Sequence, residues 1–388
     1  MDNFIYHNPT KLYFGKGEIK KLDEAVPKTG TVLLLYGGGS IMKNGVYEQA
    51  RAALGSRTVL DFGGIEANPT YETLMKAVAL GREEQVEFLL AVGGGSVLDG
   101  TKFVAAALPF EGEPWDIVTG RKHPKSAVPL GAVLTLPATG SEMNPSSVIS
   151  RKATQEKLGF GSNHVFPRFS ILDPETTMSL PPRQVANGIV DAFVHVVEQY
   201  LTYPAAAPLQ DRMAEAILLT LIETGPKTMA DPQDYDHRAT LCWCATMALN
   251  GLLSCGVPGD WATHRIGHEL TALYDIDHAR TLAVVLPSLW HLQRTTKQAK
   301  LLQYAERVWG LTEGDEQARI DEAIRKTATF FESLGVPSRL ADYPEVVTDT
   351  PATVAARLAG RNFLPLGEQK DITAARVTAI LAHSLTVA

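Results

Sequence analysis

The sequence predicts an α/β domain with a parallel sheet over residues 1–180, followed by an all-α domain over residues 181–388. Short, fully apolar runs alternate with amphipathic stretches in the first part, as expected for parallel strands that helices cover on both faces. Beyond Leu180-Pro181-Pro182 these runs disappear and long helical patterns follow. The length of 388 residues also favours two domains, at roughly 150 residues per domain.

The predicted strands of the first domain are mainly apolar, which indicates strands buried on both faces. Their ranges are 31–36, 58–62, 88–92, 131–135 and 169–173. The helical patterns of the second domain are separated by several glycine and proline residues. They span 183–202, 206–225, 236–256, 261–273, 297–309, 315–334 and 372–386.

The composition argues against nucleic acid and membrane partners. The net charge is −7, whereas a phosphate-binding surface needs clustered lysine and arginine. No apolar run approaches the ~18 residues of a membrane span, and the N-terminus lacks the pattern of a secretion signal. Three cysteines are an odd and sparse number that fits reduced thiols, so a cytoplasmic protein is expected. Cys242 and Cys244 resemble half of a metal site, but without a second pair core packing is favoured.

Two glycine turns, each directly after a predicted strand, indicate a dinucleotide site. They are Gly37-Gly38-Gly39-Ser40 and Gly93-Gly94-Gly95-Ser96. Glycine lets the backbone approach a pyrophosphate, and a following helix offers free N–H groups. The second turn departs from the G-x-G-x-x-G fingerprint, because Leu98 stands three residues after Gly95. A simple tight turn is the alternative, but two such turns favour the cofactor interpretation.

The residues after the 31–36 strand favour NADP(H) over NAD(H). NAD-selective sites place an acidic residue at a strand end, where it accepts hydrogen bonds from the ribose hydroxyls. In this chain the strand is followed by glycines and Ser40, and then by Lys43. A carboxylate would repel the 2′-phosphate of NADP, whereas backbone N–H groups, a hydroxyl and a lysine attract it.

One carboxylate and four imidazoles in the second domain have spacings that suit a metal ion. Asp191 and His195 are four residues apart, as are His264 and His268, and His278 follows ten residues later. Residues four apart share a helix face, so each pair points to one side without distortion of the backbone. A single histidine is more often a surface or core residue, but this grouping favours a metal site. The His264 pair lacks the glutamate of a metalloprotease motif, which argues against hydrolytic zinc chemistry.

The chain resembles the iron-containing alcohol dehydrogenase family along essentially its full length. More narrowly, it is similar to the bacterial NADPH-dependent broad-specificity aldehyde reductases, which are often called butanol dehydrogenases. The family matches are residues 173–181, residues 188–198, the pair His264 and His268, and Asp277-His278-Ala279, while residues 92–102 and 136–142 support the narrower group. The resemblance implies a Rossmann-like α/β domain of the dehydroquinate synthase type, followed by a helical metal-binding domain.

The resemblance also implies a division of the candidate site residues into roles. The metal, Fe2+ or Zn2+, is expected on Asp191, His195, His264 and His278. His268 is then left outside this set, near the substrate, where it assists proton transfer. NADP(H) is expected against Gly37, Gly38, Gly39, Ser40, Asn68, Gly93, Gly94, Gly95, Ser96, Asp99, Thr135 and Thr139, with Lys157 close by. Many relatives have a threonine where this chain has Leu136, which puts a cofactor contact from that position in doubt.

The activity that the resemblance implies is reversible reduction of a short-chain, neutral aldehyde by hydride transfer from NADPH. The metal polarises the carbonyl in this reaction. A homodimer is expected as well, with edge pairing of a strand at Lys11–Phe14 as one way to build it. Dehydroquinate synthase-like lyases and polyol-phosphate dehydrogenases are the alternative, but Arg265 and Arg280 are the only basic residues near the ligands. A nucleotide-binding module with a closed, structural metal site is the third possibility.

Overall fold

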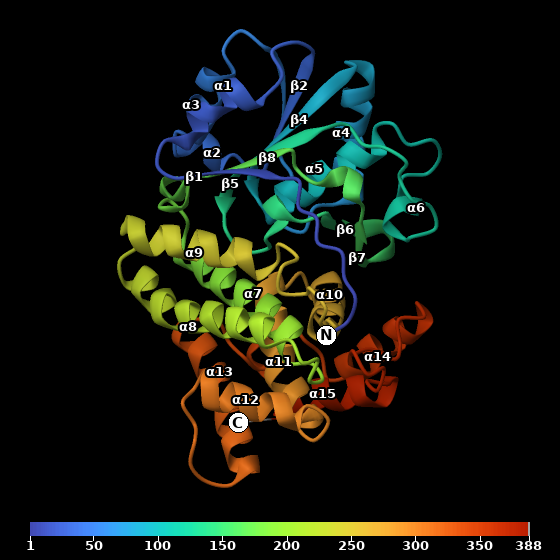
Figure 1. Ribbon diagram of the computed structural model, residues 1–388. Coiled ribbons are helices and arrows are strands. Elements are labelled where there is room, and N and C mark those ends of the chain that lie inside the picture. Colours follow the sequence, from blue (N-terminus) through green and yellow to red (C-terminus); the bar gives the residue numbers. More distant parts are fainter. Residues whose placement is uncertain (387–388) are drawn as a thin grey trace. The chain divides into compact units, whose positions relative to one another are not determined.

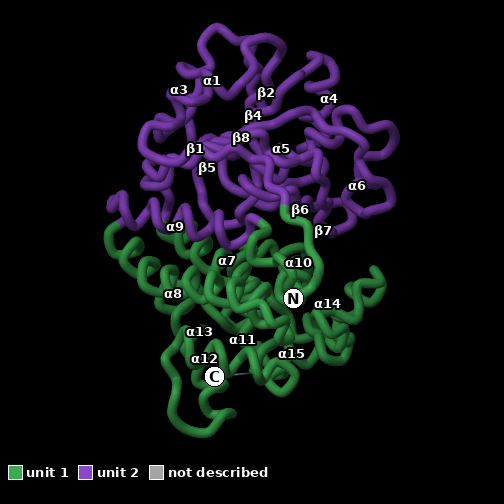
Figure 2. The backbone as a smooth tube through the Cα atoms, viewed as in Figure 1, with its two compact units in different colours: residues 1–6, 182–231, 251–388 green, residues 7–181, 232–250 purple. Residues whose placement is uncertain are grey.

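The computed structural model describes residues 1–386, which form two compact units (Figures 1 and 2). The sheet unit consists of residues 7–181 and 232–250. The helical unit consists of residues 1–6, residues 182–231 and the described residues from 251 onward. Residues 232–250 therefore belong with the sheet, although they follow residue 180. The division of the chain into domains at residue 180 stays a prediction.

The predicted parallel sheet is confirmed. Within the described residues its six strands run in the order β1-β8-β5-β4-β2-β3, and every neighbouring pair is parallel. The strands are β1 (Lys11–Phe14), β2 (Thr31–Tyr36), β3 (Thr58–Phe62), β4 (Val86–Gly94), β5 (Leu130–Leu136) and β8 (Phe169–Leu172). An antiparallel pair, β6 (Ser146–Arg151) and β7 (Glu156–Gly161), was not predicted, because its serine- and glycine-containing strands lack an apolar run.

Helices cover both faces of the sheet, as its apolar strands require. Alternate residues of a strand face opposite sides, so Val32 and Leu34 of β2 lie on one face. There they join a buried apolar cluster with residues of α2 and α3, such as Ile41 and Val46. On the opposite face α5 packs against β4, and α4 packs against α5. The helices of this unit are α1 (Leu22–Ala25), α2 (Ser40–Lys43), α3 (Val46–Leu54), α4 (Tyr71–Glu83), α5 (Gly95–Ala107), α6 (Trp115–Val118) and α9 (Tyr235–Ala248).

The strand order brings the two glycine turns together. From β2 the chain proceeds to β3 on one side, whereas β4, on the other side of β2, leads to β5. Tyr36 at the end of β2 pairs with Val92 of β4, so the two turns leave the sheet side by side at its carboxyl edge. In open parallel sheets, ligands bind at this kind of reversal in strand order.

The helical unit contains all but one of the helices that were predicted for the second half. The exception is 236–256, which is α9 of the sheet unit. The unit also contains two helices that were not predicted, α11 and α14. α11 is buried along most of its length and therefore lacks the polar stripe by which a surface helix is recognised. α14 has few large apolar residues. The helices are α7 (Pro182–Tyr200), α8 (Pro208–Ala230), α10 (Ala262–Tyr274), α11 (His278–Gln293), α12 (Gln298–Arg307), α13 (Glu316–Ser333), α14 (Thr350–Gly360) and α15 (Ala374–Thr386).

A glycine permits the close approach of α10, which carries His264 and His268, and α11, which begins at His278. At Gly267 of α10, a Cβ atom would stand 2.7 Å from Oγ1 of Thr281 on α11. The Thr281 hydroxyl donates to the carbonyl oxygen of His278 at 2.7 Å, so the contact lies at the first turn of α11.

Among residues 1–386, no helix is long and apolar enough to cross a bilayer.

Candidate active site

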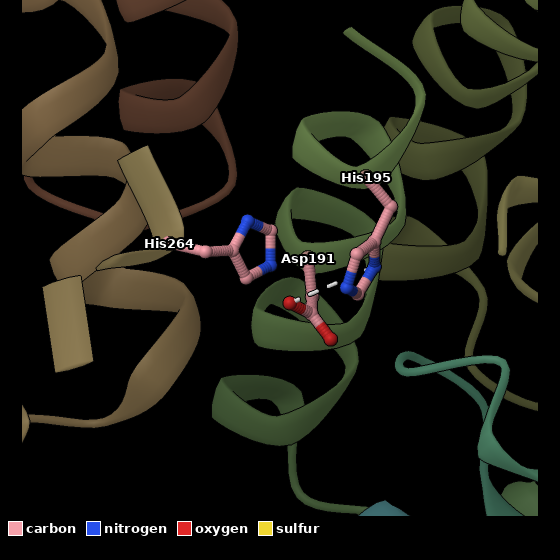
Figure 3. A group of neighbouring side chains, drawn as sticks. All are labelled: Asp191, His195 and His264. Carbon is pink, nitrogen blue, oxygen red and sulfur yellow. Dashed lines mark ion pairs between the residues drawn. The ribbon is translucent and has the colours of Figure 1, made fainter. Parts of the chain in front are cut away.

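Three of the predicted metal ligands meet in the helical unit. Asp191 and His195 lie one turn apart on α7, and His264 lies on α10 (Figure 3). One ligand atom from each of the three falls within 4.8 Å of the other two, and all three residues are buried. Asp191 and His195 point to the same side of α7, as their spacing of four residues predicted.

The two remaining histidines lie beside this group. His278 is the first residue of α11, and its Nε2 is 3.7 Å from Oδ1 of Asp191. The ring centroid of His268 is 5.1 Å from that of His278 and 6.3 Å from that of His264. The structure thus brings all five candidates together. Their division into four ligands and a separate His268 stays a prediction.

The donor atoms fit a single divalent cation. Oδ1 of Asp191 accepts no hydrogen bond from any of the described residues, and it lies 3.9 Å from Nδ1 of His195. Ligand atoms that stand at about 2.1 Å from one ion are roughly 3–4 Å apart, so only small side-chain movements are required. Imidazoles with one carboxylate suit Fe2+ or Zn2+.

Glu198, one turn beyond His195 on α7, holds His264 in place and was not predicted as a site residue. Its carboxylate accepts hydrogen bonds from Nδ1 of His264 and from the backbone N–H of Thr263 at 2.7 Å. Because Nδ1 contacts Glu198, a metal would be bound through Nε2. Burial raises the pKa of Glu198 well above its ordinary value, and the charge of Asp260 raises it further. Glu198 lies seven residues after Asp191, which places both on one helix face. This spacing was the sequence signal that could have identified Glu198 as a site residue.

Several predicted cofactor residues gather at the carboxyl edge of the sheet. Oγ of Ser96 accepts a hydrogen bond from the backbone N–H of Asn68 at 3.3 Å. Nζ of Lys157 donates to Oδ1 of Asn68 at 2.8 Å, which connects the β6–β7 pair to the second glycine turn. A Cβ atom on Gly95 would come within 2.5 Å of the Thr139 side chain, so that threonine packs directly against the turn. Thr135 is buried near the end of β5.

The Asp99 carboxylate accepts hydrogen bonds from other residues of the sheet unit. It accepts hydrogen bonds from Oγ of Ser141 at 2.6 Å and from the backbone N–H of Val148 at 2.9 Å. Burial raises the pKa of its carboxyl group, and the charge of Lys102 opposes that shift. Lys102, which was not predicted, donates to Oγ of Ser141 and to the carbonyl oxygen of Asn144, each at 2.8 Å. Burial lowers the pKa of Lys102 to about 8. Together these contacts fix the loop after Thr139 beside the glycine turn.

The first glycine turn leaves space for a side chain at one position. A Cβ atom built on Gly38 meets no heavy atom within 4 Å, and Gly38 does not have a positive φ angle. Gly39, in contrast, has a φ of 90° and is the N-cap residue directly before α2. Lys43 lies exposed in the same short helix.

Comparisons with known proteins match both units. A family model described as iron-containing alcohol dehydrogenase matches residues 9–174, and the C-terminal model of the Fe-containing alcohol dehydrogenase family matches residues 185–385. The chain is 59% identical to the NADPH-dependent aldehyde reductase YqhD of Escherichia coli, over 96% of this chain and 97% of that protein. It is 46% identical to the probable NADH-dependent butanol dehydrogenase 1 of Bacillus subtilis, over 99% of this chain and 100% of that protein.

Solved structures agree with these sequence matches. The crystal structure of Escherichia coli YqhD superposes with a TM-score of 0.97 at 56% identity, covering 99% of each chain. The structure of NADH-dependent butanol dehydrogenase A from Thermotoga maritima gives a TM-score of 0.93 at 35% identity, covering 98% of each chain. The predicted family and fold are confirmed, and the chain belongs to the iron-containing alcohol dehydrogenase family.

Proposed function

We propose that this protein is a metal-dependent aldehyde reductase that uses NADP(H) to interconvert small neutral aldehydes and alcohols in the cytosol. The observation that carries the proposal is the buried group of Asp191, His195 and His264, whose ligand atoms lie within 4.8 Å of one another. The glycine turns at the reversal of strand order, without an acid after β2, support the choice of cofactor. The 59% identical relative named as an NADPH-dependent aldehyde reductase supports the substrate class.

The residues of the site have distinct tasks in this proposal. When bound, a divalent cation supplies a Lewis acid for a carbonyl oxygen and the nicotinamide supplies a hydride. Asp191, His195, His264 and His278 hold the cation, while Glu198 keeps the His264 ring in one tautomer through its Nδ1 contact. His268, buried beside His278, holds a proton and passes it to the product oxygen.

An assay with NADPH and a panel of substrates tests the proposed function. We expect NADPH oxidation with unbranched short-chain aldehydes, in proportion to the metal content of the preparation. Phosphorylated ketones, the oxidised forms of polyol phosphates, should give no NADPH oxidation, because the sequence around the ligands offers few basic residues to bind a phosphate, chiefly Arg265 and Arg280. Turnover of the phosphorylated compounds instead would favour the polyol-phosphate dehydrogenase alternative, and no turnover of either class would favour a nucleotide-binding module.

Substitution of Gly38 by aspartate tests the cofactor preference. We expect Gly38→Asp to shift the ratio of kcat/KM for NADPH and NADH toward NADH by about tenfold or more, since about 1.4 kcal/mol of repulsion suffices for a factor of ten. The open space at this position lets the side chain enter without distortion of the turn. Gly360→Asp is the matched control, because Gly360 also has open space and is exposed at the end of α14. An unchanged ratio in Gly38→Asp would overturn the 2′-phosphate argument.

We also propose a homodimer that forms through the free edge of β1. β1 is an edge strand of the sheet. The backbone N–H groups of Lys11 and Gly15 donate to β8, so by alternation the N–H of Leu12 points away from the sheet. An outward row of N–H and C=O groups is suited to pairing with the same strand of a second copy.

Two substitutions at Leu12 separate strand pairing from side-chain packing. Leu12→Pro removes the outward N–H and keeps the bonds to β8, whereas Leu12→Ala removes only the side chain. Light scattering is expected to give twice the chain mass of 42.0 kDa for the wild type and Leu12→Ala, and one chain mass for Leu12→Pro. A wild-type monomer, or a Leu12→Pro variant that stays dimeric, would exclude this mode of assembly.

A further inference from the structure

Four residues at intervals of four form a polar stripe along α7. They are Arg183, Asn187, Asp191 and His195, and residues with this spacing lie on one face of a helix. The last two belong to the candidate metal group. The first two bind a different residue, Asp277, which directly precedes His278. One helix face therefore contacts both the metal site and the start of α11.

The contacts to Asp277 converge on one oxygen atom. Oδ2 of Asp277 accepts a hydrogen bond from Nε of Arg183 at 2.7 Å and another from Nδ2 of Asn187 at 2.9 Å. Nε of Arg280 lies 3.6 Å from the same oxygen. The Asp277 side chain makes no capping hydrogen bond to α11, although it occupies the N-cap position. Its carboxylate is therefore used to dock the helix start on α7 rather than to cap the helix.

His278 is held by less surrounding structure than Asp191 and His195. It stands at the first position of α11, after a connection in which Asp275 has a φ of 56°. Its side chain is 23% exposed, against 4–5% for Asp191 and His195, so less of the surrounding core holds it. It also lies outside the group of three that meet within 4.8 Å.

We propose that Arg183 and Asn187, through Asp277, position His278 as the fourth ligand of the metal. This inference rests on the proposed function, in which His278 binds the metal. α7 then contributes two ligands directly and sets the place of a third on another helix. Asn187 is the more important of the two donors, because only 8% of its surface is exposed. Arg183 has a side chain that is 59% exposed, and exposed ion pairs contribute little.

Release of Co2+ from the full-length loaded protein tests this role. Loss of the visible Co2+ absorption after addition of EDTA gives the release rate. We expect Asn187→Ala to release Co2+ about 10–100-fold faster than the wild type, the usual effect of removing a group that orients a ligand. Arg183→Ala should change the rate less than Asn187→Ala. The isosteric Asp277→Asn, which keeps the volume of the side chain, should also speed release.

A matched control and a swapped pair distinguish positioning from general stability. Gln293→Ala removes a buried amide of α11 that donates to Asp371 at 3.0 Å, and it should leave the release rate unchanged. The double variant Asn187→Asp with Asp277→Asn exchanges donor and acceptor and should restore slow release. Equal acceleration in Gln293→Ala, or a wild-type rate in Asn187→Ala, would overturn the positioning role.

His278→Ala separates this inference from the proposed function. Fast release from His278→Ala together with wild-type release from Asn187→Ala would remove the positioning role and leave the ligand assignment intact. An unchanged rate in His278→Ala would remove the ligand assignment, and with it the positioning role.

Discussion

Asp191→Ala is expected to lose bound metal and aldehyde reductase activity together. Asp191 supplies the only carboxylate of the candidate ligand group, and its Oδ1 stands within 4 Å of nitrogen atoms from both His195 and His278. Without it, three neutral imidazoles would have to hold a divalent cation with no anionic partner in contact. Loss of Lewis-acid catalysis is worth several kcal/mol, so kcat/KM should fall by at least about 10³-fold.

Metal content and turnover are measured on the same preparations of this variant. Elemental analysis gives the bound metal per chain, and NADPH oxidation with butyraldehyde gives kcat/KM. Asp236→Ala, which removes an exposed carboxylate from α9, should match the wild type in both. Full activity of a metal-depleted Asp191→Ala protein would refute the proposed role of the metal.

Lys297→Met is expected to cost about 3–5 kcal/mol of stability, because it leaves buried carboxylates without their cation. Nζ of Lys297 lies 2.9 Å from Oδ2 of Asp260 and 2.9 Å from Oε1 of Glu368. It also donates to the carbonyl oxygen of Leu201 at 2.8 Å, and the lysine is 3% exposed. Asp260 in turn accepts from the backbone N–H of Ala262 at the start of α10, so the ion cluster supports the helix that carries His264.

The loss of stability in Lys297→Met should be smaller in acid. Burial raises the pKa of Glu368 above its ordinary value of 4.5, while Lys297 opposes that shift. Without Lys297 the pKa of Glu368 in the folded state rises further. The folded protein then binds a proton on Glu368 at a pH where the unfolded chain does not. Stability relative to the wild type is therefore recovered as the pH falls from 7 through this raised pKa toward 4.5.

Urea unfolding at several pH values measures this effect. Lys227→Met, which changes an exposed lysine of α8, is the control and should unfold within about 0.5 kcal/mol of the wild type. A Lys297→Met protein as stable as the wild type at pH 7 would mean that the two carboxylates are not held as ions by this lysine.

Local patterns in the sequence determined the elements and the ligand candidates. The apolar run at 31–36 coincides with β2, because a strand buried on both faces leaves a continuous apolar signal. The run at 58–62 coincides with β3, an edge strand that is only partly buried. The four-residue spacing of Asp191 and His195 placed both on one helix face, which is a property of helix geometry alone. Family resemblance added the choice of four ligands, which spacing left open.

Only the tertiary structure identified the groups that hold those ligands. Glu198 binds His264 across 66 residues, and Asn187 binds Asp277 across 90. The cation for Asp260, which precedes α10, comes from Lys297 at the N-cap of α12. Such contacts depend on how helices pack, and no periodicity within one element encodes them. Spacing along the chain therefore predicted which residues would bear the chemistry, whereas the packing of α7, α10 and α11 placed the side chains that contact those candidates.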